Sequence, residues 1–223
     1  MSVQLTQPQI AEHILYPESD GQPMGETDLH RQIMTAVIAA LEDRYRDEPE
    51  VYVSGNLSVY YEKGDPTAVF APDAFVVFGV PKHVRRTYKL WEEGQKGPDV
   101  VFEITSESSS LDDEGKKKVI CRRLGVREYF LFDPQEEYLD PPLQGFRLDG
   151  FYYMPIRPDE NGQLYSELLD VYLRRENRNL RLIDAQTGEK LLTPQEAQEA
   201  RRQAEAEVAR LQAELNRLRQ NKE

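Results

Sequence analysis

The sequence predicts a fold of mixed α/β class, because helix and strand patterns share one chain. Residues 97–134 read as an apolar strand, a polar loop, a basic helix, a glycine turn and a second strand. Residues 26–46 repeat apolar side chains at intervals of three and four, which is typical of an amphipathic helix. Beyond Pro134 the pattern changes to short alternating strands around turn residues, which is typical of β-hairpins.

The chain of 223 residues is long enough for one well-packed core. We expect one domain over residues 1–192 and a separate helix over residues 193–223. A hydrophobic content of 39% and a charged content of 30% are typical of a soluble protein. No apolar run approaches the roughly 20 residues of a membrane span, and the first residues lack the pattern of a secretory signal. Because Cys121 is the lone cysteine, we expect no internal disulfide and a cytoplasmic location.

The net charge of −12 argues against strong nonspecific binding to nucleic acid. Residues 193–223 hold six basic and six acidic side chains, so the acidic excess lies in residues 1–192. Within that acidic body the basic side chains form two clusters along the sequence, and such a cluster binds a polyanion locally. The clusters are Lys82, Arg85, Arg86 and Lys89, and Lys116, Lys117, Lys118, Arg122 and Arg123.

The N-terminal part of the chain contains an arm and the first helix. Residues 1–25 carry three prolines and two glycines and are expected to contribute at most a short edge strand around residues 11–16. Thr27 or Asp28 is the expected N-cap of the helix over residues 26–46. Extending its apolar stripe towards the N-terminus reaches His30 and Glu26, so both side chains could face the surface on which the helix packs.

Three strand signals follow, at residues 51–53, 56–61 and 70–78. Pro72 lies within the third signal, which implies a sheet edge, a bulge or the first residue of a strand. Asp73 therefore lies at a strand entrance. Residues 79–97 are polar and basic and are expected to form a long loop or a short helix, a type of segment that is often functional.

Within the strand over residues 99–105, Glu103 stands where a covered strand would carry Val or Ile. An unpaired buried charge is costly, so Glu103 needs a partner, such as a metal ion or a lysine, or else the strand lies at a sheet edge. Asp99 is about 13 Å away along the strand, too far to share one ion. Asp73, on a neighbouring strand, could approach Glu103 across about 4.8 Å and is the better co-ligand.

Two converging carboxylates suit a hard divalent cation, either Mg²⁺ or Mn²⁺. Such an ion polarises a phosphate and lowers the pKa of a bound water. A lysine that orients this water would be sought two residues after Glu103, where the chain has Thr105. The consecutive lysines on the helix over residues 112–124 are the available substitutes.

The C-terminal segment begins with a helix start, in which Thr193, Pro194 and Glu196 form a capping box. Beyond it, and interrupted by Arg201, apolar residues fall at alternating spacings of three and four, at Ala197, Ala204, Val208, Leu211, Leu215 and Leu218. This heptad pattern predicts a short coiled coil and a homo-oligomer. The alternative is one amphipathic helix packed on its own domain.

Four motifs occur in order along the chain. They are Ala71-Pro72-Asp73, Val101-Phe102-Glu103-Ile104-Thr105-Ser106, a helix bearing Lys117, and Gly125-Val126-Arg127-Glu128-Tyr129 leading to Asp133-Pro134. As a set they resemble the Uma-type endonuclease family of the PD-(D/E)XK restriction-endonuclease-like superfamily. The similarity extends from residue 26 to the turn at residues 187–189.

The resemblance implies a restriction-endonuclease-like mixed central sheet with flanking helices. It implies that Asp73 and Glu103 are metal ligands and that Lys117 is a catalytic lysine moved from the strand to the helix. His30 and Glu26 match the polar start of the family's first helix, where a further site residue is expected.

We therefore expect a metal-dependent endonuclease that hydrolyses DNA phosphodiester bonds. Asp73, Glu103 and the main-chain carbonyl of Ile104 would hold Mg²⁺ or Mn²⁺, and Lys117 would orient the attacking water. The alternative, from another class, is a catalytically silent nuclease-like domain that the coiled coil assembles into a structural or partner-binding module. Hydrolysis of sugar or nucleotide phosphates at the same metal is a third possibility.

Each candidate residue also has a purely structural explanation. Glu103 could pair with a basic residue of the core. Asp73 could be a turn residue, and Lys117 could pair with Asp113 four residues earlier on an exposed helix. His30 could be an ordinary helix residue whose ring is satisfied by its neighbours.

Overall fold

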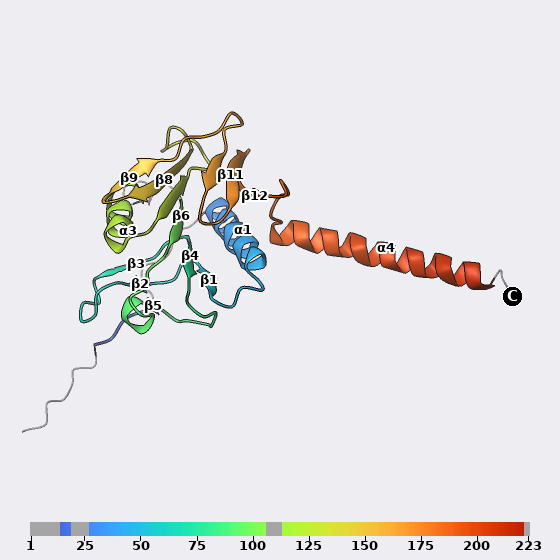
Figure 1. Ribbon diagram of the computed structural model, residues 1–223, viewed down its shortest axis with the longest axis horizontal. Coiled ribbons are helices and arrows are strands. Elements are labelled where there is room, and N and C mark those ends of the chain that lie inside the picture. The colour runs from blue at the N-terminus through green and yellow to red at the C-terminus, as the bar shows by residue number, and fades with distance from the viewer. Residues whose placement is uncertain (1–13, 19–26, 106–112, 221–223) are drawn as a thin grey trace, which may run out of the picture.

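The computed structural model describes residues 14–18, 27–105 and 113–220, and its centre is a six-stranded sheet (Figure 1). In spatial order the strands are β1 (Val51–Ser54), β4 (Ala74–Phe78), β6 (Val100–Ile104), β7 (Glu128–Phe132), β8 (Leu143–Asp149) and β9 (Tyr152–Pro155). The β6–β7 pair is parallel, and each of the other neighbouring pairs is antiparallel. The predicted mixed α/β fold, with a mixed central sheet and flanking helices, is confirmed.

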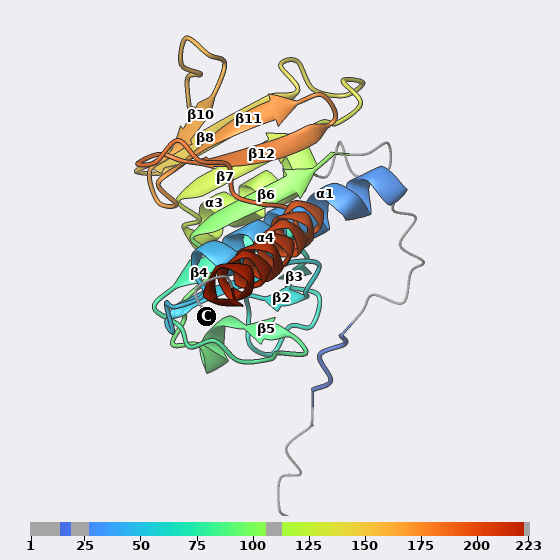
Figure 2. The ribbon, with the colours of Figure 1, turned by 90° about the vertical axis from the view of Figure 1, so that its right-hand side faces the viewer.

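One face of this sheet packs against α1 (Asp28–Arg44) and a second sheet (Figure 2). α1 begins after Thr27, whose Oγ1 accepts a hydrogen bond from the His30 main-chain N–H at 3.2 Å. Its buried stripe includes Ile33, Val37 and Leu41, at the spacings that the sequence predicts. The second sheet joins the same core and contains β10 (Leu164–Ser166), β11 (Val171–Glu176) and β12 (Asn179–Asp184).

The other face packs against α3 (Lys118–Leu124) and a small sheet. The strands of the small sheet are β3 (Val69–Phe70), β2 (Val59–Tyr60) and β5 (Tyr88–Lys89). A π-helical turn over Asp113–Lys117 leads into α3, which Gly125 ends at a φ of 76°. Gly adopts this left-handed conformation without the steric penalty of a Cβ atom, so it suits the end of the helix.

β6 lies between the two cores, and its residues alternate between them. Phe102 and Ile104 pack in the core that includes α1, whereas Val101 packs in the core that includes α3. The alternation directs Glu103 towards α3. Because β6 has β4 on one side and β7 on the other, the alternative that Glu103 belongs to an edge strand is wrong.

Three expectations about local structure need correction. Residues 79–97 include β5 and the single-turn 3-10 helix η1 (Leu90–Glu92), because Tyr88 and Leu90 are buried in the core. The strand expected over residues 70–78 is divided around Pro72, so that β3 ends at Phe70 and β4 begins at Ala74. The edge strand expected around residues 11–16 lies partly outside the described residues, and residues 14–16 are not in a strand.

α4 (Pro194–Gln220) projects away from the rest of the molecule (Figure 1). Its first turn contains the predicted capping box, in which the Thr193 N–H donates to Glu196 Oε2 at 2.8 Å and the Glu196 N–H donates to Thr193 Oγ1 at 3.3 Å. Arg181 on β12 also donates to both carboxylate oxygens of Glu196, at 2.7 and 2.8 Å. Across the described residues, we find no helix with the length and apolar character needed to cross a membrane.

Candidate active site

Asp73 and Glu103 meet at one end of the central sheet. The antiparallel register pairs Ala74 with Phe102, which brings the residue before Ala74 opposite Glu103. The main-chain N–H of Asp73 lies 3.4 Å from Glu103 Oε2. Asp73 is 8% exposed and Glu103 is 1% exposed. Asp73, at the entrance of β4, and Glu103, on β6, therefore lie next to each other, and both are mostly buried.

Asp73 is held by groups from two other elements. Its Oδ2 accepts a hydrogen bond of 2.6 Å from the main-chain N–H of Ile104, the last residue of β6. The His30 Nε2 on the first turn of α1 lies 3.1 Å from the same oxygen. His30 is buried, so the contact is shielded from bulk water. These contacts fix one oxygen of Asp73.

Lys117 contacts the same site from the face of the sheet that packs against α3, opposite to the face from which His30 contacts Asp73. Its Nζ lies 2.8 Å from Glu103 Oε2, and the carboxylate side chain of Glu103 is fully buried. Lys117 is the last residue of the π-helical turn before α3. The Lys117 side chain is 21% exposed, so it lies between the buried carboxylate and the surface. The contact with Glu103 joins the π-helical turn to β6.

Cys121 is buried in the core that includes α3, on the face of the sheet towards which Glu103 points. Burial raises the pKa of the Cys121 thiol, and the negative charge of Glu103 raises it further, although Lys117 acts in the opposite direction. A thiol that stays protonated is a poor nucleophile and a poor metal ligand. Cys121 is therefore a packing residue.

The donor set of the site is suited to a hard cation. Asp73 and Glu103 offer carboxylate oxygens, and the site's sulfur atom belongs to the protonated Cys121. Within the described ranges 14–18, 27–105 and 113–220, no group of three or more His, Cys, Asp or Glu side chains forms a metal-binding cluster. Glu26, the remaining predicted site residue, lies outside the described residues.

Asp99 lies at the other end of β6 and has a structural role. Its Oδ2 accepts a hydrogen bond of 2.7 Å from the Phe78 main-chain N–H. Its Oδ1 accepts two hydrogen bonds from the Arg127 guanidinium, at 2.8 and 3.1 Å. The prediction that Asp99 is too distant to join Glu103 agrees with this arrangement.

The basic cluster over residues 82–89 is largely occupied by contacts within the protein. The Arg85 side chain is 3% exposed and donates to Glu93 at 2.7 and 2.9 Å. Lys82 donates to main-chain carbonyls at the end of α1, and Lys89 lies 3.2 Å from Glu92. Arg86 lies 2.6 Å from Glu18. These contacts make the cluster a weaker candidate for phosphate binding than its sequence suggests.

Gly55 supports the site and was not identified from the sequence. A Cβ atom at Gly55 would lie 2.0 Å from the Asp73 carbonyl oxygen and 2.6 Å from Ile38 Cδ1. The next residue, Asn56, donates its N–H to the Pro72 carbonyl at 2.8 Å. Only a residue without a side chain allows this close approach. A glycine at a strand end is the one available sequence signal, and it does not reveal the distant partner.

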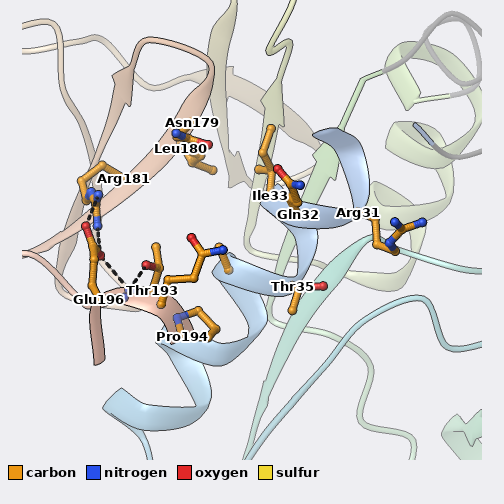
Figure 3. Close-up of a pocket in the computed structure, with 12 residues that line it drawn as sticks. Arg31, Gln32, Ile33, Thr35, Asn179, Leu180, Arg181, Thr193, Pro194 and Glu196 are labelled. Atoms are coloured by element: carbon orange, nitrogen blue, oxygen red, sulfur yellow. Dashed lines mark hydrogen bonds and ion pairs between the residues drawn. The ribbon is translucent and has the colours of Figure 1, made fainter. Parts of the chain in front are cut away.

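A pocket of about 450 Å³ lies away from these residues, between α1, β12 and the start of α4 (Figure 3). Arg181 and Glu196 on one wall bind each other, as the dashed lines in Figure 3 show. Arg31 on the opposite wall lies 2.6 Å from Asp28. Because these charges are paired, the pocket is a junction between the body and α4 and adds no further group to the site.

Comparison with known proteins gives a family match. A family model described as "Uma2: Putative restriction endonuclease" matches residues 12–200. The match confirms the resemblance that the sequence motifs indicate, and its range contains each predicted site residue.

Two further comparisons add little. No curated protein matches the chain. A crystal structure described as "a putative nuclease belonging to DUF820", from Anabaena variabilis, is similar at 16% identity and a TM-score of 0.49, over 66% of this chain and 76% of that chain. A similarity of that size supports no argument about activity.

Proposed function

The chain belongs to the Uma2 family, and from this premise we propose that it is a metal-dependent endonuclease that hydrolyses phosphodiester bonds in DNA. The observation that carries the proposal is the meeting of Asp73, Glu103 and Lys117 at one end of the central sheet. Hydrolysis of a phosphodiester needs oxygen ligands for a cation and positive charge near the developing negative charge. These three side chains could supply both.

Mg²⁺ or Mn²⁺ fits the residues of the site. Both ions prefer oxygen ligands, and Mg²⁺ usually keeps several waters while taking one or two carboxylates from the protein. Asp73 and Glu103 would supply the carboxylates, and the main-chain carbonyl of Ile104 would be the third ligand from the protein. A bound ion supplies Lewis acidity, which polarises the phosphate and lowers the pKa of a coordinated water.

Lys117 and His30 would orient the reacting groups. The Lys117 ammonium would orient the attacking water and offset negative charge on the phosphate, because it is held 2.8 Å from Glu103 and is partly exposed. His30 would hold the orientation of Asp73 through the contact of 3.1 Å with Oδ2. That contact leaves Asp73 Oδ1 without a hydrogen bond among the described residues, so Oδ1 is the oxygen that could face a cation.

The basic residues of α3 are the proposed contact for DNA phosphates. Arg122 and Arg123 are exposed on the helix that follows Lys117. The body of the protein is acidic, so this contact would be local and would weaken steeply with salt. The same residues would also suit a smaller phosphate ester, and a comparison of duplex DNA with nucleotide and sugar phosphates as substrates would distinguish these classes.

The test is isothermal calorimetry with Mg²⁺ and Mn²⁺, combined with cleavage of duplex DNA, on the wild type and on Asp73→Asn and Glu103→Gln. We expect both variants to lose cation binding and cleavage while circular dichroism shows a retained fold. Asp99→Asn is the matched control, since Asp99 immediately precedes β6, at the end of that strand opposite to Glu103. Equal cleavage by Glu103→Gln and the wild type would contradict the proposal.

A second candidate function is assembly, and the exposed apolar residues of α4 favour it. Val208, Leu211 and Leu215 are 53%, 50% and 49% exposed, and each occupies a core position of the heptad pattern. An isolated helix in water gains little stability from its own hydrogen bonds and needs a packed apolar face. A second copy of α4 would provide that face in a coiled coil.

The heptad positions favour parallel pairing of two copies. Val208 falls on position a and Leu211 on position d, and a β-branched residue at a with Leu at d favours two parallel strands. Glu207 and Glu214 fall on position g. Antiparallel pairing would bring these g positions of the two copies together, so that like charges repel, whereas parallel pairing would place Glu207 beside Gln212.

Light scattering would test the assembly on the full chain and on a variant truncated after residue 192. We expect the full chain to be a dimer and the truncated variant to be a monomer that still binds Mg²⁺. A Leu215→Cys variant should form an intermolecular disulfide in the parallel arrangement, because position a residues face each other. Equal masses per particle for the full and truncated chains would contradict self-association through α4.

A further inference from the structure

Thr105 is buried next to the site, and its hydroxyl has no partner among the described residues. Thr105 is 2% exposed, and its Oγ1 makes no hydrogen bond there. Its main-chain N–H donates to the Phe132 carbonyl at 2.8 Å, which extends the β6–β7 ladder by one residue beyond Ile104. Buried polar groups of folded proteins nearly always have a partner in the protein, in water or in a ligand. The hydroxyl of Thr105 therefore requires an explanation.

The direction of the side chain follows from the strand. Successive residues of an extended chain point to opposite faces, so Thr105 points to the same face as Glu103. The distance between them along the strand is about 7 Å, at 3.3 Å per residue. This is the face on which Lys117 contacts Glu103. We therefore expect the Thr105 hydroxyl on the same side of the sheet as the carboxylate and ammonium of the site, at a separation that a bound phosphate and its water could span.

We infer that the Thr105 hydroxyl binds an oxygen atom of the reacting groups. The atom belongs either to the attacking water or to a nonbridging oxygen of the substrate phosphate. A hydroxyl both donates and accepts hydrogen bonds, so it suits either source. The inference rests on the proposed nuclease function and adds a residue to its site, at the position where a lysine would be sought from the sequence and Thr stands instead.

The test compares Thr105→Val with Thr105→Ser. Val has nearly the same shape but lacks the hydroxyl, whereas Ser keeps it. Without substrate or metal, Thr105→Val should keep or raise the melting temperature, because it removes a buried hydroxyl that lacks a partner. Cleavage by Thr105→Val should fall by about tenfold or more, as for loss of one well-placed hydrogen bond in a transition state, and Thr105→Ser should retain most of it.

Ser166→Ala is the control for stability. Ser166 is also fully buried, but its Oγ donates to Glu128 and accepts from the Leu169 N–H at 3.2 Å. Removal of this satisfied hydroxyl should lower the melting temperature by about 2 °C or more. A loss of the same size for Thr105→Val would show that its hydroxyl serves the fold, and would overturn the inference.

Binding and turnover distinguish the two sources of the oxygen. Equilibrium binding of duplex DNA can be measured with Ca²⁺, which takes oxygen ligands like those of Mg²⁺ but in a looser geometry. Weaker binding by Thr105→Val identifies a phosphate oxygen, whereas unchanged binding with a lower kcat identifies the attacking water. Unchanged binding together with unchanged kcat overturns the inference.

The nuclease proposal can fail separately. If the wild type does not cleave DNA, that proposal fails, and Thr105 is then judged by binding of inorganic phosphate in calorimetry. Weaker phosphate binding by Thr105→Val, with Thr105→Ser close to the wild type, would still support an oxygen-binding role. Equal binding by all three proteins would overturn it.

Discussion

Lys117 Nζ lies 2.8 Å from Glu103 Oε2, so a partly exposed lysine side chain contacts a glutamate side chain that is fully buried. If Lys117 orients the attacking water, Lys117→Met should lower kcat by about 100-fold or more and change KM little. The physical reason is that its charge matters most when negative charge develops in the transition state. Steady-state cleavage of duplex DNA at several substrate concentrations measures both constants.

Lys116→Met is the matched control for that prediction, because it removes the same charge from the adjacent position. We expect its kcat to stay within about threefold of the wild type, with a higher KM if the positive charge of this segment attracts DNA. If Lys116→Met lost as much kcat as Lys117→Met, the effect would belong to the charge of the whole segment and Lys117 would have no special role.

Gly55→Ala should damage the site without touching any proposed ligand side chain. A Cβ atom would lie 2.0 Å from the Asp73 carbonyl oxygen, so the main chain at Asp73 must move. We expect a loss of about 1–3 kcal/mol in the free energy of unfolding, as for an overpacked core. A displacement of about 1 Å is enough to reduce catalysis by about 100-fold. Urea unfolding measures the first effect and cleavage of duplex DNA the second, while Mg²⁺ calorimetry shows whether the cation still binds.

Gly97→Ala provides the comparison for Gly55→Ala. The nearest atom to a Cβ at Gly97 is Leu90 Cδ2 at 3.7 Å, which is an ordinary van der Waals contact. Its effects on stability and on Mg²⁺ binding should be small. Normal Mg²⁺ affinity in Gly55→Ala would mean that the position of the Asp73 main chain does not control the site.

The pairing of Asp73 with Glu103 could be predicted because each carries a local signal. Glu103 is a charge within an apolar strand, and Asp73 follows a proline at a strand entrance. Strand spacing alone then excludes Asp99. The contact of Lys117 with Glu103 could not be predicted from local signals alone, because a helix with several adjacent lysines does not show which one reaches the sheet. The motif order of the family supplied that choice.

The remaining differences come from contacts between distant segments. β5 is two residues long. It forms because Tyr88 and the nearby Leu90 pack in a core whose other residues are distant in the sequence. Gly55 and Asp73 are likewise brought together by the fold, through packing that no local pattern records. The local pattern of apolar residues predicts elements with strong periodicity, such as α1. It does not predict short elements whose formation depends on tertiary packing.

The ion pair of Glu128 with Arg147 should be important for stability and separate from the site. Glu128 is fully buried and accepts hydrogen bonds from Arg147 at 2.9 and 3.1 Å and from the Glu167 N–H at 3.0 Å. Arg147→Met leaves this buried charge without its cation, so we expect a loss of about 3 kcal/mol in the free energy of unfolding. Chemical denaturation measures the loss, and Mg²⁺ affinity of the folded fraction should not change.

Two further variants qualify the Arg147→Met result. Arg157→Met removes an exposed arginine from the nearby segment after β9 and should change stability by less than about 0.5 kcal/mol. The double variant Arg147→Met with Glu128→Gln should recover part of the loss, since it removes the uncompensated charge. A double variant that is less stable than Arg147→Met would contradict the argument from buried charge.

The attachment of α4 should depend on pH through Glu196. The hydrogen bonds from Arg181 lower the pKa of Glu196 from 4.5 to about 2. A carboxylate with a depressed pKa in the folded state stabilises the fold at pH values above its unfolded pKa, and this contribution is lost as pH falls through the folded pKa. The first turn of α4 should therefore loosen as pH falls from about 5 to about 2. Because the Glu196 side chain is 41% exposed, the contribution should be about 1 kcal/mol or less.

Hydrogen exchange of the Ala197 amide, which donates to the Thr193 carbonyl at 2.8 Å, measures this loosening as a change in protection factor. Glu196→Gln should show low protection at pH 6 and little further change on acidification, because the titrating group is gone. Glu199→Gln removes the same charge three residues later in α4 and should behave like the wild type. Equal pH dependence in the wild type and Glu196→Gln would show that the pair with Arg181 does not hold the start of the helix.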